Sequence, residues 1–143
     1  MWSHRRYPDF FDSGFTGTSA LFKSTDGGKT WAKIHNGLPA TTLGRIGIAV
    51  APSNPRIVYA SIEAKGDTNK GLYKSEDQGA TWKKINSDFS NTVRPFYFSR
   101  LTVDPRNPDN ILKCAFVPII STDGGIKFRS MGSPHAVSYT HLT

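Results

Sequence analysis

The sequence contains a single cysteine, Cys114, among its 143 residues. One cysteine cannot form an intramolecular disulfide, and the apolar residues around it predict a small buried side chain rather than a nucleophile. No apolar run approaches the roughly 20 residues of a membrane-spanning helix, and residues 1–6 lack the apolar core of a signal peptide. We therefore expect a domain that relies on neither internal disulfides nor a membrane segment within these residues.

Acidic residues are scarce relative to basic ones. The chain has 11 aspartates and glutamates against 18 lysines and arginines, which gives a net charge of +7. Such a charge suits nucleic-acid binding when it gathers on one patch, but here the densest cluster is only His4, Arg5 and Arg6. Four further lysines are predicted to face solvent from strands: Lys70, Lys74, Lys83 and Lys84. We expect no nucleic-acid partner.

The most prominent feature of the sequence is an octet that occurs three times. Its copies are Ser24–Trp31, Ser75–Trp82 and Ser121–Phe128, and their starts lie 51 and then 46 residues apart. Repeats of this length are typical of propeller blades, and 13 glycines with 9 prolines suit short strands joined by tight turns. The predicted fold class is all-β, a partial β-propeller with about two and a half four-stranded antiparallel blades of a larger, roughly seven- to ten-bladed or double propeller.

A second motif recurs in the same order as the octet. Pro52, Asn54 and Pro55 of one turn match Pro105, Asn107 and Pro108 of the next. The two motifs predict a half blade over residues 1–36, a blade over 44–87 and a blade over 98–131, within a propeller segment of residues 1–135. Residues 136–143 match neither motif and resemble translated adaptor DNA, so they are treated as a non-native or disordered tail. The predicted strands are 1–6, 20–24, 30–34, 46–50, 57–62, 71–75, 81–85, 100–103, 111–116, 119–121 and 127–131.

The residue types of the octet predict a folding role. A serine and an aspartate can accept hydrogen bonds from turn amides, a glycine can adopt positive φ, and the aromatic ring returns to the apolar layer. The three aspartates are separated by a whole blade each, so they cannot converge on one substrate, and they lack the successive ligands of a calcium loop. We expect no metal site and no cofactor. The structural octet residues are Ser24, Asp26, Gly28, Trp31, Ser75, Asp77, Gly79, Trp82, Ser121, Asp123, Gly125 and Phe128.

The octet Ser-x-Asp-x-Gly-x-Thr-Trp resembles the Asp-box, or BNR repeat, of sortilin-like propellers and xyloglucanase-like glycosyl hydrolases. The stretches Gly44–Pro55, Val58–Ala60 and Gly71–Asp77 are similar to large secreted bacterial proteins of this kind. The resemblance implies an extracellular or periplasmic parent protein, a carbohydrate or peptide ligand, and further blades of the parent as partners. The third octet departs from the pattern because Lys127 stands where the others have threonine.

Candidate site residues are polar residues that flank the predicted strands. Glu63 and Asp67 are the candidates for catalysis, and His4, Arg5 and Arg45 are the candidates for ligand binding. Glycoside hydrolysis needs two carboxyl groups roughly 5 to 9.5 Å apart, and the sequence does not single out such a pair. Two functions stay open: part of a glycosyl hydrolase-like protein that acts on or binds glycans, and a non-catalytic sortilin-type propeller that binds peptides or partner proteins.

Overall fold

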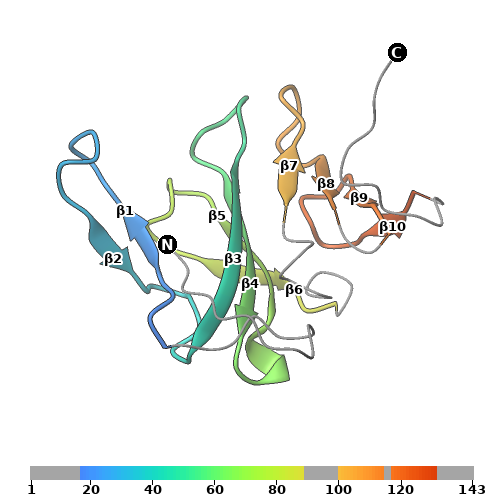
Figure 1. Ribbon diagram of the computed structural model, residues 1–143. Coiled ribbons are helices and arrows are strands. Elements are labelled where there is room, and N and C mark those ends of the chain that lie inside the picture. The colour runs from blue at the N-terminus through green and yellow to red at the C-terminus, as the bar shows by residue number, and fades with distance from the viewer. Residues whose placement is uncertain (1–16, 89–99, 115–116, 132–143) are drawn as a thin grey trace, which may run out of the picture.

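The computed structural model describes residues 17–88, 100–114 and 117–131, and these residues form three antiparallel sheets (Figure 1). The helical structure in this part of the chain is one short 3-10 turn, η1. The predicted all-β class is confirmed. The bounds are β1 Leu21–Lys23, β2 Ala32–Ile34, β3 Leu43–Val50, β4 Val58–Ala64, η1 Asp67–Asn69, β5 Gly71–Ser75, β6 Lys83–Asn86, β7 Leu101–Val103, β8 Ile111–Lys113, β9 Ile119–Ser121 and β10 Arg129–Ser130.

Each sheet is built from strands that follow one another along the chain. The two-stranded sheet pairs β1 with β2, the central sheet has the order β3-β4-β5-β6, and the last sheet has the order β7-β8-β9-β10. The three sheets lie side by side in chain order, with the central one between the other two (Figure 1). Antiparallel neighbours joined by short turns are the arrangement of a propeller blade, so the topology agrees with the predicted class.

Strand β4 shows how the central sheet is held from both sides. All seven of its residues, Val58–Ala64, are buried. Because successive side chains in a strand point to opposite faces, Ala60 and Ile62 pack against Leu21 of the first sheet. Tyr59 points the other way, packs with Ile111 of the last sheet, and donates its hydroxyl hydrogen bond to the Pro108 carbonyl at 3.0 Å. Two apolar interfaces therefore hold the three sheets together.

The predicted fourth strand of the central sheet begins two residues too early. It was expected over 81–85, whereas β6 runs from Lys83 to Asn86. The Thr81 amide donates to the Asp77 carboxylate at 2.8 Å, and the Trp82 amide donates to the Asn36 carbonyl at 3.0 Å. Both amides therefore already have acceptors outside the ladder between β5 and β6, and strand pairing begins only after them.

The prediction that Cys114 is buried is wrong, because this residue is exposed. It follows Lys113, whose side chain points into the interface with the central sheet. Alternation of side chains along the strand directs Cys114 to the opposite face, which no described sheet covers.

The prediction that Lys74 faces solvent is also wrong, because its side chain is largely buried beside Glu76. The predicted strand at 1–6, the candidates His4 and Arg5, the end of the strand predicted at 111–116, and the tail at 136–143 lie outside the described residues.

Candidate functional site

The octets form closed hydrogen-bonded turns between strands. In the second octet, Asp77 accepts from the Thr81 amide at 2.8 Å and from the Thr81 hydroxyl at 2.6 Å. The Ser75 hydroxyl donates to Asp77 at 2.7 Å and accepts from the Gly79 amide at 2.8 Å. The Trp82 indole N–H donates to the Gly79 carbonyl at 3.0 Å. Turn donors and acceptors are thus paired within eight residues, which leaves the Asp77 carboxylate engaged rather than available to a ligand.

The first octet repeats this network atom for atom. Asp26 accepts from the Thr30 amide at 2.9 Å and from the Thr30 hydroxyl at 2.6 Å, and the Trp31 indole donates to the Gly28 carbonyl at 3.0 Å. The threonine hydroxyl is the largest cause of a lowered pKa at Asp26, as it is at Asp77. Both carboxylates are therefore ionised at neutral pH and unsuited to donate a proton in catalysis.

The third octet forms the same turn with fewer hydrogen bonds than the first two octets. Asp123 accepts from the Lys127 amide at 3.0 Å, and the Ser121 hydroxyl accepts from the Gly125 amide at 2.9 Å. Lysine has no hydroxyl, so the bond that threonine supplies in the other octets is missing. The pKa of Asp123 is lowered, chiefly by the Lys127 amide.

Glu63 is buried in the central sheet, with 4% of its surface exposed. The pairing of β3 with β4 has an irregularity here, because Leu43 pairs with Ala64 and the next pair joins Ile46 to Ile62. Two residues of β3 therefore lie opposite Glu63 alone, which is the arrangement of a β-bulge. The carboxylate of Glu63 accepts a hydrogen bond at 2.7 Å from the Arg45 amide within the bulge. This contact gives Glu63 a defined backbone partner that the sequence did not reveal.

Arg45 and Asp67 lie at the same end of the central sheet as Glu63. Arg45 is half-buried, and desolvation lowers its pKa, with the Glu63 carboxylate opposing that shift and Arg100 adding to it. Asp67 begins η1, directly beyond the end of β4, and its side chain is 97% exposed while it pairs with Lys70 at 3.1 Å. The two catalytic candidates therefore occupy different environments, one inside the sheet and one in solvent.

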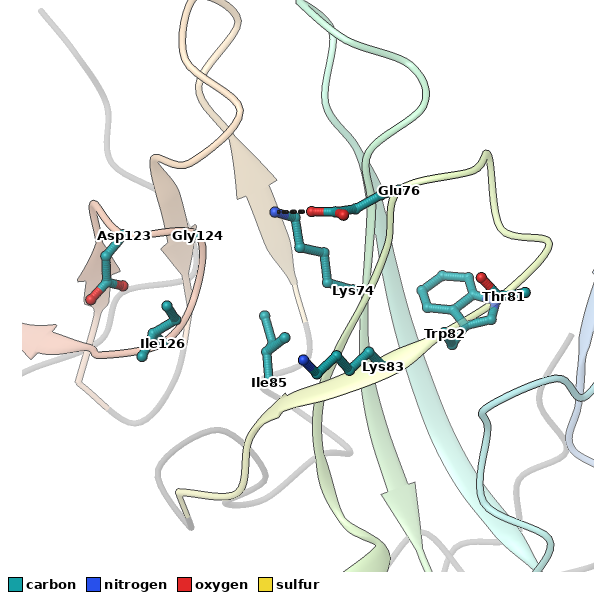
Figure 2. A pocket seen from close by; sticks show the side chains of 9 residues that line it. All are labelled: Lys74, Glu76, Thr81, Trp82, Lys83, Ile85, Asp123, Gly124 and Ile126. Carbon is teal, nitrogen blue, oxygen red and sulfur yellow. Dashed lines mark ion pairs between the residues drawn. The ribbon is translucent and has the colours of Figure 1, made fainter.

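A cavity of about 310 Å³ lies between the central sheet and the third octet (Figure 2). Lys74 and Glu76 form an ion pair of 2.9 Å on one wall, and Asp123 and Ile126 stand on the other (Figure 2). The hydrogen bond from Lys74 is the first cause of a lowered pKa at Glu76. Since the pKa of Asp123 is lowered as well, both acids in the cavity are ionised at neutral pH. The cavity can offer hydrogen-bond acceptors and cations to a polar ligand, but these two groups supply no general acid.

Lys113 is a buried ionisable residue that does not belong to the candidates predicted from the sequence. Its side chain is fully buried between the central and last sheets, and its Nζ donates to the Ser61 hydroxyl at 2.8 Å. The repeat alignment contains a signal of its burial, because Lys113 follows Pro108 at the same interval as the buried Ala60 follows Pro55.

Among the described ranges there is no group of three or more histidine, cysteine or acidic side chains that could hold a metal ion. The same ranges contain no helix long and apolar enough to cross a membrane.

Comparison with known proteins identifies the class of this fold. The family model Sortilin-Vps10, described as sortilin, neurotensin receptor 3, matches residues 19–140. The chain therefore belongs to the Sortilin-Vps10 family. This membership agrees with the octets and with the three antiparallel sheets.

Two relatives and one solved structure show the range of similar proteins. The chain is 34% identical over 90 residues to a xyloglucanase of Paenibacillus sp., covering 63% of this chain and 8% of the relative. It is 35% identical over 109 residues to an uncharacterised membrane glycoprotein of Saccharomyces cerevisiae, covering 73% of this chain and 9% of the relative. The crystal structure of the GH74 enzyme of Niastella koreensis superposes with a TM-score of 0.58 at 22% identity, covering 85% of this chain and 19% of that one.

These matches confirm the predicted fold and the resemblance. The chain is part of a β-propeller that is like the propellers of glycosyl hydrolases. It spans less than a tenth of the length of the curated relatives described above. The structural likeness, at 22% identity, supports the fold alone.

Proposed function

We propose that this chain is a propeller segment of a longer glycosyl hydrolase-like protein that acts on xyloglucan or a related plant glucan. The observation that carries the proposal is the 34% identity to a xyloglucanase over 90 residues. The three sheets would be successive blades, with boundaries near residues 1–36, 44–87 and 98–131. The remaining blades of the parent protein would complete the ring.

In this proposal the general acid is none of the carboxyl groups of the cavity or of the octets. Glu76 and Asp123 in the cavity are held ionised, and the octet aspartates are used inside their own turns. Glycoside hydrolysis needs one carboxyl group that is protonated at working pH, and these groups are unsuited to that task. The described segment would then contribute rigidity and part of a glycan-binding face.

The end of the central sheet where β3 begins and β4 ends is the proposed contribution to that face. Arg45 and η1 both lie there, and propeller ligands bind at a face of the ring rather than at its outer rim. Glu63 would act as a positioning residue, since its carboxylate holds the Arg45 amide in the bulge. Asp67 would contact glycan hydroxyl groups only as an exposed hydrogen-bond acceptor.

The test is hydrolysis by the full-length protein that contains this chain. The folded parent should release reducing ends from xyloglucan, and the same assay with cellulose and with a peptide library gives its specificity. Saturable peptide binding without sugar release from any glucan would favour the non-catalytic sortilin-type alternative and overturn the hydrolase proposal.

Glu63→Gln in the same parent separates positioning from catalysis. Glutamine keeps an oxygen that can accept from the Arg45 amide, so we expect the melting temperature and most of the activity to be retained. Glu63→Ala should lower the melting temperature because the Arg45 amide loses its acceptor. Loss of activity in Glu63→Gln at an unchanged melting temperature would instead make Glu63 a catalytic residue.

A further inference from the structure

The interface between the central and last sheets contains a lysine without a carboxylate partner among the described residues. Lys113 ends β8, its side chain has 0% exposure, and its Nζ donates to the Ser61 hydroxyl of β4 at 2.8 Å. A buried lysine is normally paired with an acid, because burial of an unpaired charge is costly. A neutral serine hydroxyl can satisfy a neutral amine but cannot compensate a positive charge.

Comparison of the two four-stranded sheets shows that this amine replaces an apolar group. Ala60 in β4 and Lys113 in β8 lie five residues after Pro55 and Pro108, and both are fully buried against the preceding sheet. The lysine therefore occupies a core position rather than the margin of the interface. Ser61 lies two residues after Tyr59 in β4, so both side chains are on the same face of the sheet and the Ser61 hydroxyl points into the same interface.

The surroundings of Lys113 favour its neutral form. Burial alone lowers its pKa from 10.5 to about 7. Tyr59 and Glu63 share its face of β4, but the tyrosine hydroxyl donates to the Pro108 carbonyl and the glutamate accepts from the Arg45 amide. The other charged residues of β3, β5 and β6, and the residue before β7, are all cations, so they provide no counter-charge for a protonated amine: Arg45, Lys74, Lys83, Lys84 and Arg100.

We propose that Lys113 is a proton-sensitive contact between the two four-stranded sheets, which holds them tightly when its amine is neutral and loosens them when the amine is protonated. This proposal goes beyond the proposed function and does not depend on it. A segment that carries such a contact changes the strength of a sheet-to-sheet interface within the pH range of natural environments.

The sign of the pH dependence follows from proton binding in the two states. An unfolded chain protonates Lys113 below its ordinary pKa of 10.5, whereas the folded chain does so only below about 7. Between these values the unfolded state binds the additional proton, so the unfolding equilibrium constant falls by up to about tenfold for each unit of rising pH. Below about pH 7 both states carry the proton. The contribution of Lys113 to the free energy of unfolding is then constant and at its least favourable value.

The experiment is urea unfolding of the full chain between pH 6 and pH 10, on the wild type, Lys113→Met and Lys33→Met. Lys33 lies exposed in β2 and provides the matched control. We expect the unfolding constant of the wild type and of Lys33→Met to fall more steeply with pH than that of Lys113→Met, with a difference of up to about tenfold per unit between pH 8 and pH 10. Equal slopes in all three proteins would overturn the proposal.

A direct measurement covers the case in which Lys113→Met does not fold. The side-chain NMR signals of isotope-labelled lysines in the wild-type chain report the pKa of each amine, and Ser61→Ala identifies Lys113 through the shift of one signal. One lysine that titrates near pH 7 supports the proposal. If every lysine titrates near pH 10, the amine is charged in the folded chain at neutral pH and the proposal is wrong.

Discussion

The first and second octets have the same local structure and different surroundings. Asp26 and Asp77 make matching bonds to Thr30 and Thr81, and each indole N–H donates to a glycine carbonyl at 3.0 Å. Yet the tryptophan of the first octet, Trp31, is 62% exposed, whereas Trp82 is 6% exposed. The sequence predicts both rings in an apolar layer, and for Trp31 that prediction is wrong.

The difference arises from what each tryptophan faces. Trp82 packs against Ile34 and Leu21 of the preceding sheet, and the Asn36 carbonyl accepts from its amide. Phe128 of the third octet likewise packs against the central sheet that precedes it. For Trp31 the equivalent preceding sheet is not among the described residues. The octet therefore places its ring locally, and burial of that ring depends on the preceding sheet.

The largest effect that tests this comparison is truncation of the two tryptophans. Trp82→Ala should lower the free energy of unfolding by about 3–5 kcal/mol, because a large ring is removed from a packed interface. Trp31→Ala should cost less than about 1 kcal/mol, as expected for a surface substitution. Urea unfolding of both variants measures the two values. Similar losses would mean that the indole contact within the turn, rather than the preceding sheet, stabilises the octet.

A second effect separates backbone strain from packing at the octet glycines. Gly28 and Gly125 both have φ of +90°, so alanine is strained equally at either position. A Cβ at Gly125 would lie 2.6 Å from Leu72 Cδ2, whereas at Gly28 the nearest atom, in Trp31, is 3.8 Å away. Gly125→Ala should therefore destabilise the chain by about 1–3 kcal/mol more than Gly28→Ala in thermal unfolding. Equal destabilisation of the two variants would mean that backbone strain at positive φ, and not the contact with Leu72, causes the whole loss of stability.

A third effect concerns acid. The pKa of Asp26 and of Asp77 is lowered in the folded chain, so each carboxylate contributes stability above its unfolded pKa near 3.9, and that stability is lost as pH falls below this value. Asp77→Asn should flatten the fall of the melting temperature between pH 4 and pH 2. Asp26→Asn should flatten it equally, because the two networks match. Unequal slopes would show that burial of the ring strengthens the bonds beneath it.

The smallest effect is expected in the third octet. Lys127→Thr restores the hydroxyl donor that Thr30 and Thr81 supply to their aspartates. The melting temperature should rise slightly, and the pKa of Asp123 should fall further in an NMR titration. Lys29→Thr changes an exposed lysine of the first octet and serves as the control. An unchanged Asp123 pKa would indicate that the third turn cannot adopt the threonine geometry.

The sequence predicted the repeat, the all-β class and most strands, because these depend on residues close together in the chain. The limits of β6 could not be predicted, since the Trp82 amide bonds to Asn36, which lies 46 positions earlier. The exposure of Cys114, the residue after β8, could not be predicted either, because a side chain there is buried only where another sheet packs on its face. Glu63 was chosen as a candidate by its place after a strand, but its backbone partner in the bulge depends on the pairing of β3 with β4.

Local hydrogen bonding was determined by the sequence itself, because serine, aspartate, glycine and threonine at fixed spacing can satisfy one another within a single turn. Burial was decided only by the tertiary structure, because it depends on a neighbouring sheet that comes from a distant part of the chain. The same indole is therefore buried at one octet and exposed at another. For the same reason Lys113 becomes a core residue with a pKa lowered to about 7, because the central sheet excludes water from its amine.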